Sequence, residues 1–419
     1  PNTPFTSPPP ALSATASSGL TVTYVSITTA TCTVAGSTIT FVAAGACSIT
    51  ASQAGNANFT AATPVTQSFT ITAGVNTITF SALPNTPFTS PPPALSATAS
   101  SGLTVTYVSI TTATCTVAGS TITFGAAGGC SITASQAGNA NYAAATPVTQ
   151  SFTITAGVNT ITFPALANTP FTSPPPALTA TASSGLTIVY TSTTTATCTV
   201  AGSAITFVAA GSCSITASQP GNANFAAATP VVQSFSITPG TNTITFAALT
   251  DRAIGSGAFT VSATASSSLV VAFASSTPAT CSVAGSSVSL LAVGQCSIVA
   301  TQPGNVNFAA ATPVTQSFAI TKATTTVMLT ASATSIMFGL PVTLTATVTG
   351  VTPTGTVTFR DGGAALATVA VAGGVASFTT KSLANGAHTF TAAYSGDINN
   401  NATTSAGVVV TVNARPDPS

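Results

Sequence analysis

A passage of 83 residues occurs four times in this chain, and the copies keep one register throughout. Residues 1–80 and 84–163 differ at only four aligned positions. Eight cysteines mark the period of 83 residues: Cys32, Cys115, Cys198 and Cys281 form one series, and Cys47, Cys130, Cys213 and Cys296 form the other. A period this long does not suit a solenoid repeat that needs its neighbours for a core. It indicates a row of small domains that each fold alone.

Charge is almost absent from the chain and excludes several classes of protein. Charged residues make up 2% of the sequence, and residues 1–250 contain no Asp, Glu, Lys, Arg or His. Nucleic acid is excluded as a partner, because phosphate contacts need Lys and Arg. A membrane-spanning segment is excluded because Ser or Thr interrupts every long apolar run. Disorder is disfavoured by the abundance of Val, Ile, Thr and Phe. A net charge of +1 leaves little repulsion between copies, so self-association into fibres or a coat of sugars is expected.

Copy two shows the local pattern of one repeat. Alternation between turn signals predicts seven strands: Asn76–Phe80, Ala94–Ser100, Leu103–Ser109, Thr114–Ala118, Ser120–Phe124, Cys130–Gln136 and Val148–Thr155. In the last of these, Val148, Phe152 and Ile154 share one face, opposite a face of Thr and Ser. This pattern predicts an all-β, immunoglobulin-like antiparallel sandwich. The Pro91–Pro93 run is expected at an edge or in a connection.

The cysteines share strand faces with core residues, since Cys115 has the parity of Val117 and Cys130 that of Ile132. We therefore predict disulfides within repeats: Cys32–Cys47, Cys115–Cys130, Cys198–Cys213 and Cys281–Cys296. Buried free thiols are the alternative, and a metal site lacks a neighbouring His or carboxylate to complete four ligands. Disulfides indicate an oxidising compartment, hence an extracellular or cell-surface protein. The start without Met or a signal peptide is expected of a mature or trimmed product.

Residues 323–413 keep the strand rhythm but change the sequence. The run Val342–Val348 alternates strictly, Arg360-Asp361-Gly362-Gly363 is a hairpin signal, and a further strand-like segment covers Gly386–Asp397. This succession resembles the bacterial Ig-like repeats found in tandem in large secreted and cell-surface proteins, and the four copies resemble a cysteine-bearing branch. The resemblance implies that the repeats serve as stalks, adhesin arms, filament units or spacers in enzymes, and that they carry no catalytic residues.

The period predicts five units and a tail: residues 1–74, 75–157, 158–240, 241–322, 323–413 and 414–419. Short linkers such as Ala73–Val75 predict a constant rotation between the first three units, with a small deviation in unit four and the largest in unit five. Unit one lacks a counterpart of Asn76–Phe80, which predicts an open sheet edge and an uncovered apolar strip. Another molecule or upstream residues of the same chain are the two expected sources of the covering strand. The tail has two prolines and no alternation, so it is a poor donor.

Few residues could support chemistry, and we expect no enzyme activity, metal or cofactor. His388 is the only histidine and shares parity with Phe390, which favours a satisfied rim or core residue. Asp361 is interpreted as a solvated turn residue beside Arg360. Asp397 is expected to cap a turn or, with the asparagines after it, to form a weak cation site.

A Gly-Asn-x-Asn loop ending in an aromatic residue recurs in the four copies. Its asparagines are Asn56, Asn58, Asn139, Asn141, Asn222, Asn224, Asn305 and Asn307. The loops could bind glycans multivalently. Alternatively, Asn supplies left-handed turn geometry while Phe59 or Tyr142 closes the end of the sandwich. The sequence thus predicts a non-catalytic bacterial fibre or stalk protein, with a glycan-binding or matrix-binding adhesin arm as the alternative and a spacer cut from a large enzyme third.

Overall fold

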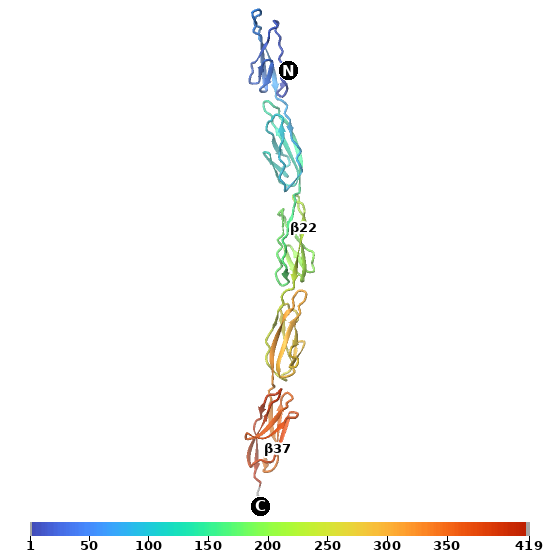
Figure 1. The fold of residues 1–419 in the computed structure, drawn as a ribbon, viewed down its shortest axis with the longest axis vertical. Helices are drawn as coiled ribbons and strands as arrows, with labels where there is room; N and C mark the ends of the chain where they lie inside the picture. Colours follow the sequence, from blue (N-terminus) through green and yellow to red (C-terminus); the bar gives the residue numbers. More distant parts are fainter. Residues whose placement is uncertain (1, 416–419) are drawn as a thin grey trace.

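The computed structural model describes residues 2–415, and strands are the regular secondary structure found there. Five sandwiches follow one another in a single row, so the chain forms a rod (Figure 1). The all-β, immunoglobulin-like fold predicted from the sequence is confirmed. Within the described range, no helix is long and apolar enough to cross a membrane. Residues 416–419 of the predicted tail lie outside the described residues.

Unit three shows the architecture of the repeat. Its strands are β15 (Ile161–Thr162), β16 (Thr169–Pro170), β17 (Thr181–Ala182), β18 (Val189–Ser192), β19 (Cys198–Ala201), β20 (Ala204–Phe207), β21 (Gly211–Gln219) and β22 (Ala228–Thr238). One sheet has the order β16-β22-β21-β18, and the other layer consists of the pairs β15–β17 and β19–β20. Phe163, Ile215 and Phe235 lie in the core between them.

Units one and two repeat this plan. Unit one consists of β1 (Thr3–Pro4), β2 (Thr23–Ser26), β3 (Cys32–Ala35), β4 (Thr38–Phe41), β5 (Gly45–Ser52) and β6 (Val65–Thr72). Unit two consists of β7 (Ile78–Thr79), β8 (Thr86–Pro87), β9 (Thr98–Ala99), β10 (Thr106–Ser109), β11 (Cys115–Ala118), β12 (Thr121–Phe124), β13 (Gly128–Gln136) and β14 (Ala145–Thr155). No described strand of unit one corresponds to β7 or β9.

Units four and five are more elaborate. Unit four consists of β23 (Ile244–Phe246), β24 (Arg252–Ala253), β25 (Phe259–Thr260), β26 (Ala263–Ala265), β27 (Ala272–Ser275), β28 (Cys281–Ala284), β29 (Ser287–Leu290), β30 (Gly294–Gln302) and β31 (Ala311–Thr321). Unit five consists of β32 (Thr326–Ala331), β33 (Ser335–Met337), β34 (Val342–Thr349), β35 (Thr356–Asp361), β36 (Ala364–Ala370), β37 (Val375–Thr380), β38 (Gly386–Tyr394), β39 (Thr403–Thr404) and β40 (Val408–Asn413). The sheets of unit five are β32-β34-β37 and β33-β40-β38-β35-β36, and β39 pairs with β38.

A short parallel strand was missing from the sequence-based prediction, which contained antiparallel pairs only. In unit two, β8 pairs in parallel with β14, and β1, β16, β24 and β33 do the same in the other units. The chain changes layers between β7 and β8, so β8 reaches the opposite sheet at its edge. Pro87 is tolerated there because an edge strand can lack a donor. A two-residue strand containing proline leaves no alternation to detect.

Candidate functional site at the junctions between units

Four disulfides connect the two layers within units one to four. They join Cys32 to Cys47, Cys115 to Cys130, Cys198 to Cys213 and Cys281 to Cys296, the pairing expected from the sequence. All eight residues are 0% exposed. Because the sulfurs are sealed in the core, reductants reach them only when a unit opens.

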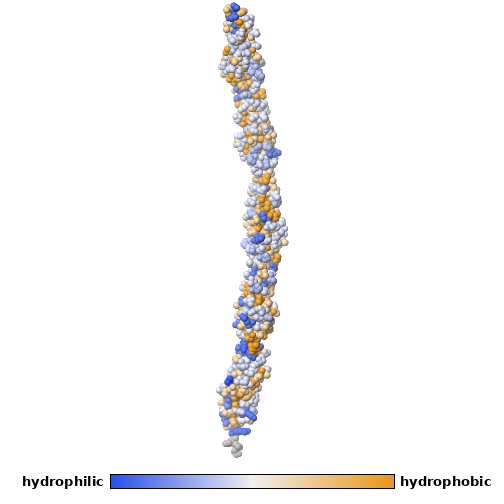
Figure 2. Space-filling model, in the orientation of Figure 1, coloured by the Kyte–Doolittle hydropathy of each residue, from blue (hydrophilic) through white to orange (hydrophobic). Residues whose placement is uncertain are grey.

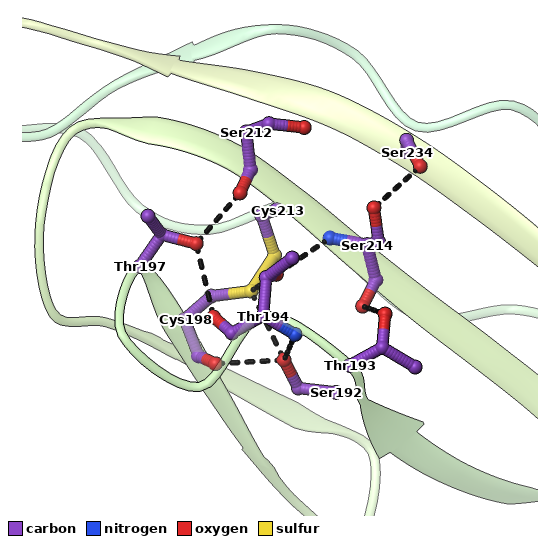
Figure 3. Close-up of a disulfide and its surroundings, with 9 residues drawn as sticks. All are labelled: Ser192, Thr193, Thr194, Thr197, Cys198, Ser212, Cys213, Ser214 and Ser234. Carbon is purple, nitrogen blue, oxygen red and sulfur yellow. Dashed lines mark hydrogen bonds between the residues drawn. A yellow bond between two sulfur atoms is a disulfide. The ribbon is translucent and has the colours of Figure 1, made fainter.

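Hydroxyl groups surround the disulfide and tie its two strands together (Figure 3). In unit three, the Ser192 hydroxyl donates to the Cys198 carbonyl at 2.8 Å, and the Thr197 hydroxyl donates to the Ser212 carbonyl at 2.6 Å. The Ser214 amide donates to the Thr194 hydroxyl at 2.9 Å. The abundant Ser and Thr therefore have a structural use here, since they satisfy backbone groups without any charge.

In units two to four, the second asparagine of the Gly-Asn-x-Asn loop reaches across to the preceding unit. The Asn141 side-chain oxygen accepts a hydrogen bond from the Ala44 amide of unit one at 2.8 Å. Asn224 does the same with Ala127 at 2.8 Å. At the next junction, Asn307 accepts from the amide of Ala210, again at 2.8 Å. These asparagines thus connect neighbouring units.

The linker glycine is held from both sides. The Gly74 amide donates to the Asn141 carbonyl at 2.9 Å, and the Ala143 amide donates to the Gly74 carbonyl at 2.8 Å. On its other side Gly74 packs on Thr6, where a Cβ atom would lie 2.5 Å from the Thr6 methyl group. Gly157 and Gly240 are equally enclosed, by Thr89 and Thr172 respectively. A larger residue has no room, so the close packing itself selects glycine.

An aromatic pair completes each of the first three junctions. Phe5 of unit one meets Tyr142 of unit two edge to face, with ring centroids 5.6 Å apart. The pairs Phe88–Phe225 and Phe171–Phe308 repeat this arrangement at 5.8 and 5.9 Å. Such pairs add about 0.5–1.5 kcal/mol beyond the area that they bury.

The fourth junction uses different side chains at the same places. Ala323 replaces the linker glycine, and its amide donates to the Asn399 carbonyl at 2.8 Å. Gly255 stands where Thr172 stands one repeat earlier, and Ile254 replaces Phe171. A Cβ atom at Gly255 would lie 2.5 Å from the Val351 side chain of unit five, so at this junction the close approach is at Gly255 and not at the linker residue. Sequence analysis missed this signal, which is visible as paired replacements between repeats.

The interpretation that asparagine supplies left-handed geometry was wrong, because glycine does so. Gly138 has a φ of 73°, and the equivalent Gly221 has 77°. The first asparagine instead caps the turn: the Asn139 side-chain oxygen accepts from the amides of Asn141 and Tyr142, at 2.9 and 3.0 Å. In unit one the same loop meets no preceding unit among the described residues, and Phe59 is 49% exposed.

Asp397 of unit five caps the equivalent loop. Its carboxylate accepts hydrogen bonds from the amides of Asn399, Asn400 and Thr354 and from the Tyr394 hydroxyl. Partial desolvation favours the neutral acid, but these donors outweigh it, so the pKa of Asp397 lies well below its usual range. The turn-capping expectation is met, and within residues 2–415 no group of three metal-ligating side chains surrounds it.

The expectation that Asp361 is solvated beside Arg360 was wrong. Asp361 ends β35, and its carboxylate contacts the His388 ring on neighbouring β38, while Arg360 donates to the Gly363 carbonyl at 2.9 Å. His388 is 14% exposed, as a rim residue should be. The Ala384 carbonyl and then the Asp361 carboxylate raise the pKa of His388, because both accept from the protonated ring.

We expect pH to change the stability of unit five and to leave units one to three unchanged. The His388 pKa is raised on folding, so its contribution is complete below pH 6.5 and is lost as pH rises through the folded pKa. Calorimetry of the full chain between pH 6 and about 9 should show a fall in the unfolding temperature of unit five. The variant His388→Gln should remove that dependence, and an unchanged slope in this variant would contradict the assignment.

Comparison with known proteins places unit five in a family. Residues 329–413 match the bacterial Ig-like domain (group 3) family, which confirms the resemblance predicted from the sequence. No curated protein sequence matches the chain.

Several solved structures are also similar to this chain, and the similarity concerns the fold alone. A tetra-tandem repeat from the extending region of a large adhesion protein is 20% identical, covers 82% of this chain and 100% of that chain, and has a TM-score of 0.28. The D00-D0 domain of intimin is 16% identical, with 41% and 99% covered and a TM-score of 0.20. Fibronectin(III)-like modules from Clostridium thermocellum are also 16% identical, with 41% and 94% covered and a TM-score of 0.21.

Proposed function

We propose that the protein is a non-catalytic, extracellular bacterial rod that belongs to a surface fibre or stalk. The observation that carries this proposal is the repeated junction, in which an asparagine, an enclosed glycine and an aromatic pair recur three times with matching distances. At each of these junctions, the contacts of the asparagine, the enclosed glycine and the aromatic pair together restrict bending between the two neighbouring units. The buried disulfides support a location outside the cell, where such bonds persist.

The surface suits a part of an assembly. Figure 2 shows mostly pale and orange residues with few strongly hydrophilic ones, as expected from a charged fraction of 2%. Low net charge leaves little electrostatic repulsion between rods. Association into fibres is therefore part of the proposal.

The glycan-binding alternative receives less support from the loops. Asn141, Asn224 and Asn307 are engaged with backbone amides of the preceding unit, which leaves the loop of unit one as the free copy in the described chain. A titration against a glycan panel is expected to show at most one site per chain. Four equivalent sites would favour the adhesin arm.

Small-angle X-ray scattering of the purified full chain tests the rod. We expect the scattering of a straight, stiff particle, because the junctions fix neighbouring units. The matched control inserts a flexible Gly-Ser segment after Gly157, which separates the linker from the Asn224 loop and should shorten the mean end-to-end distance. A wild-type curve as flexible as that of the insertion variant would contradict the proposed function.

A further inference from the structure

Unit one contains a groove where the other repeats hold a strand. Its volume is about 450 Å³, and its apolar lining includes Leu12, Tyr24 and Ile49. In unit two the equivalent space is filled by β7 and the residue after it, and Ile78 and Phe80 complete the core. Among residues 2–415, nothing fills this place in unit one.

Polar side chains in the groove lack the partners that their counterparts have. In unit two, Gln136 accepts from the Asn76 side chain at 2.5 Å, and Gln150 donates to the Phe80 carbonyl at 2.7 Å. The counterparts in unit one are Gln53 and Gln67, whose side chains form no hydrogen bond within the described chain. Both glutamines line the groove, and Gln53 is 7% exposed, so a bound strand would pair with side-chain amides that have no partner within the described chain.

The same strand sequence serves all three of the other disulfide-bearing units. Asn-Thr-Ile-Thr-Phe occurs at 76–80, 159–163 and 242–246, and it follows directly on a linker that leaves the last strand of the preceding unit. In each of these units the asparagine side chain donates a hydrogen bond to the side-chain oxygen of the equivalent glutamine, as Asn159 does to Gln219 at 2.7 Å. The groove in unit one therefore matches this pentapeptide in its shape and in the hydrogen-bonding side chains that line it.

We propose that this groove binds an Asn-Thr-Ile-Thr-Phe strand that extends from a further Ig-like repeat, and that the repeat itself seats on the exposed loop of Asn58 and Phe59. The loop carries the same asparagine and aromatic positions that hold the preceding unit at the first three junctions. Groove and loop thus present two adjacent halves of one junction. A second copy of this chain is not the donor, because its three matching strands are already placed in its own units two to four.

The proposal deepens the proposed function, since it would lengthen the rod, but strand binding can be tested separately from rod stiffness. A fluorescent peptide of residues 74–83 is titrated into the full chain and followed by anisotropy. We expect saturable binding of one peptide per chain. A peptide carrying Phe80→Asp should bind at least about tenfold more weakly, because a buried aromatic ring is lost. No saturable binding, equal binding of both peptides, or more than one site per chain would overturn the proposal.

Matched protein variants locate the site. Gln53→Ala should weaken peptide binding, whereas Gln136→Ala, the same change in unit two, should leave it unchanged. Hydrogen exchange on the unmodified chain gives a readout that needs no variant: the peptide should protect the backbone near Thr15 and Ala16, which match β9 of unit two. Protection elsewhere, or equal effects of the two glutamine variants, would show that the groove is not the binding site. Scattering of the peptide-free rod is unaffected by either result.

Discussion

Replacing Cys198 and Cys213 together by alanine is expected to lower the free energy of unfolding of unit three by about 3 kcal/mol. The bond closes a loop with a sequence separation of 15, so its loss frees the unfolded chain. Loss of packing adds to the effect because both residues are fully buried. Urea unfolding of the full chain, followed by hydrogen exchange with mass spectrometry, resolves the affected unit from its neighbours.

Unit five supplies the internal control, because its residues 323–413 contain no cysteine. Under a reductant strong enough to act during unfolding, units one to four should lose stability while unit five keeps its own. An equal loss in all five units would mean that the reductant acts by another route, and the stabilising role of the bonds would be refuted.

Gly157→Ala is expected to destabilise the second junction by about 1–3 kcal/mol through overpacking. The new methyl group would lie 2.5 Å from the Thr89 methyl group and 3.1 Å from the Thr89 amide nitrogen. Adding Thr89→Gly should restore much of the loss, because it removes the methyl group that the new Cβ atom would meet; the fourth junction carries Gly255 and Ala323 at the two aligned positions. Unfolding free energies of the two single variants and the double variant give the coupling between the positions.

Gly129→Ala is the matched control for this cycle. Nothing lies within 4 Å of a Cβ atom at Gly129, and unit one carries Ala46 at the same place. Its effect should be small. If Gly157→Ala were as mild as Gly129→Ala, the linker glycine would not fix the junction.

The strands of the repeat could largely be predicted from alternation. The buried faces of Leu103–Ser109 and Val148–Thr155 follow the predicted parity, and Phe152 and Ile154 are in the core. The disulfide pairing followed from the same parity. By contrast β8 could not be predicted, because two residues give no period and its partner β14 is distant in sequence.

The junctions could not be predicted from one repeat, because each is built from residues of two units. Asn141 looks like an ordinary turn residue until Ala44, 97 positions earlier, is placed beside it. The pairing of His388 with Asp361 was missed for a similar reason, since strand register decides which residues of β35 and β38 face each other. Comparing repeats would have revealed the exchange between Thr172–Gly240 and Gly255–Ala323.

The parallel pairing of β8 with β14 determines how a unit carries a pulling force. The linker enters at one end of the unit and β14 leaves at the other, so tension along the rod slides these two strands past each other. Their hydrogen bonds, together with the bond from the Phe88 amide to the Thr155 carbonyl at 2.8 Å, are then loaded side by side instead of one after another. If the unit unfolds under tension, the Cys115–Cys130 bond keeps the residues between the two cysteines from extending. These residues correspond to about 50 Å of extended chain. Each disulfide thus shortens the length of chain that an unfolding unit can release.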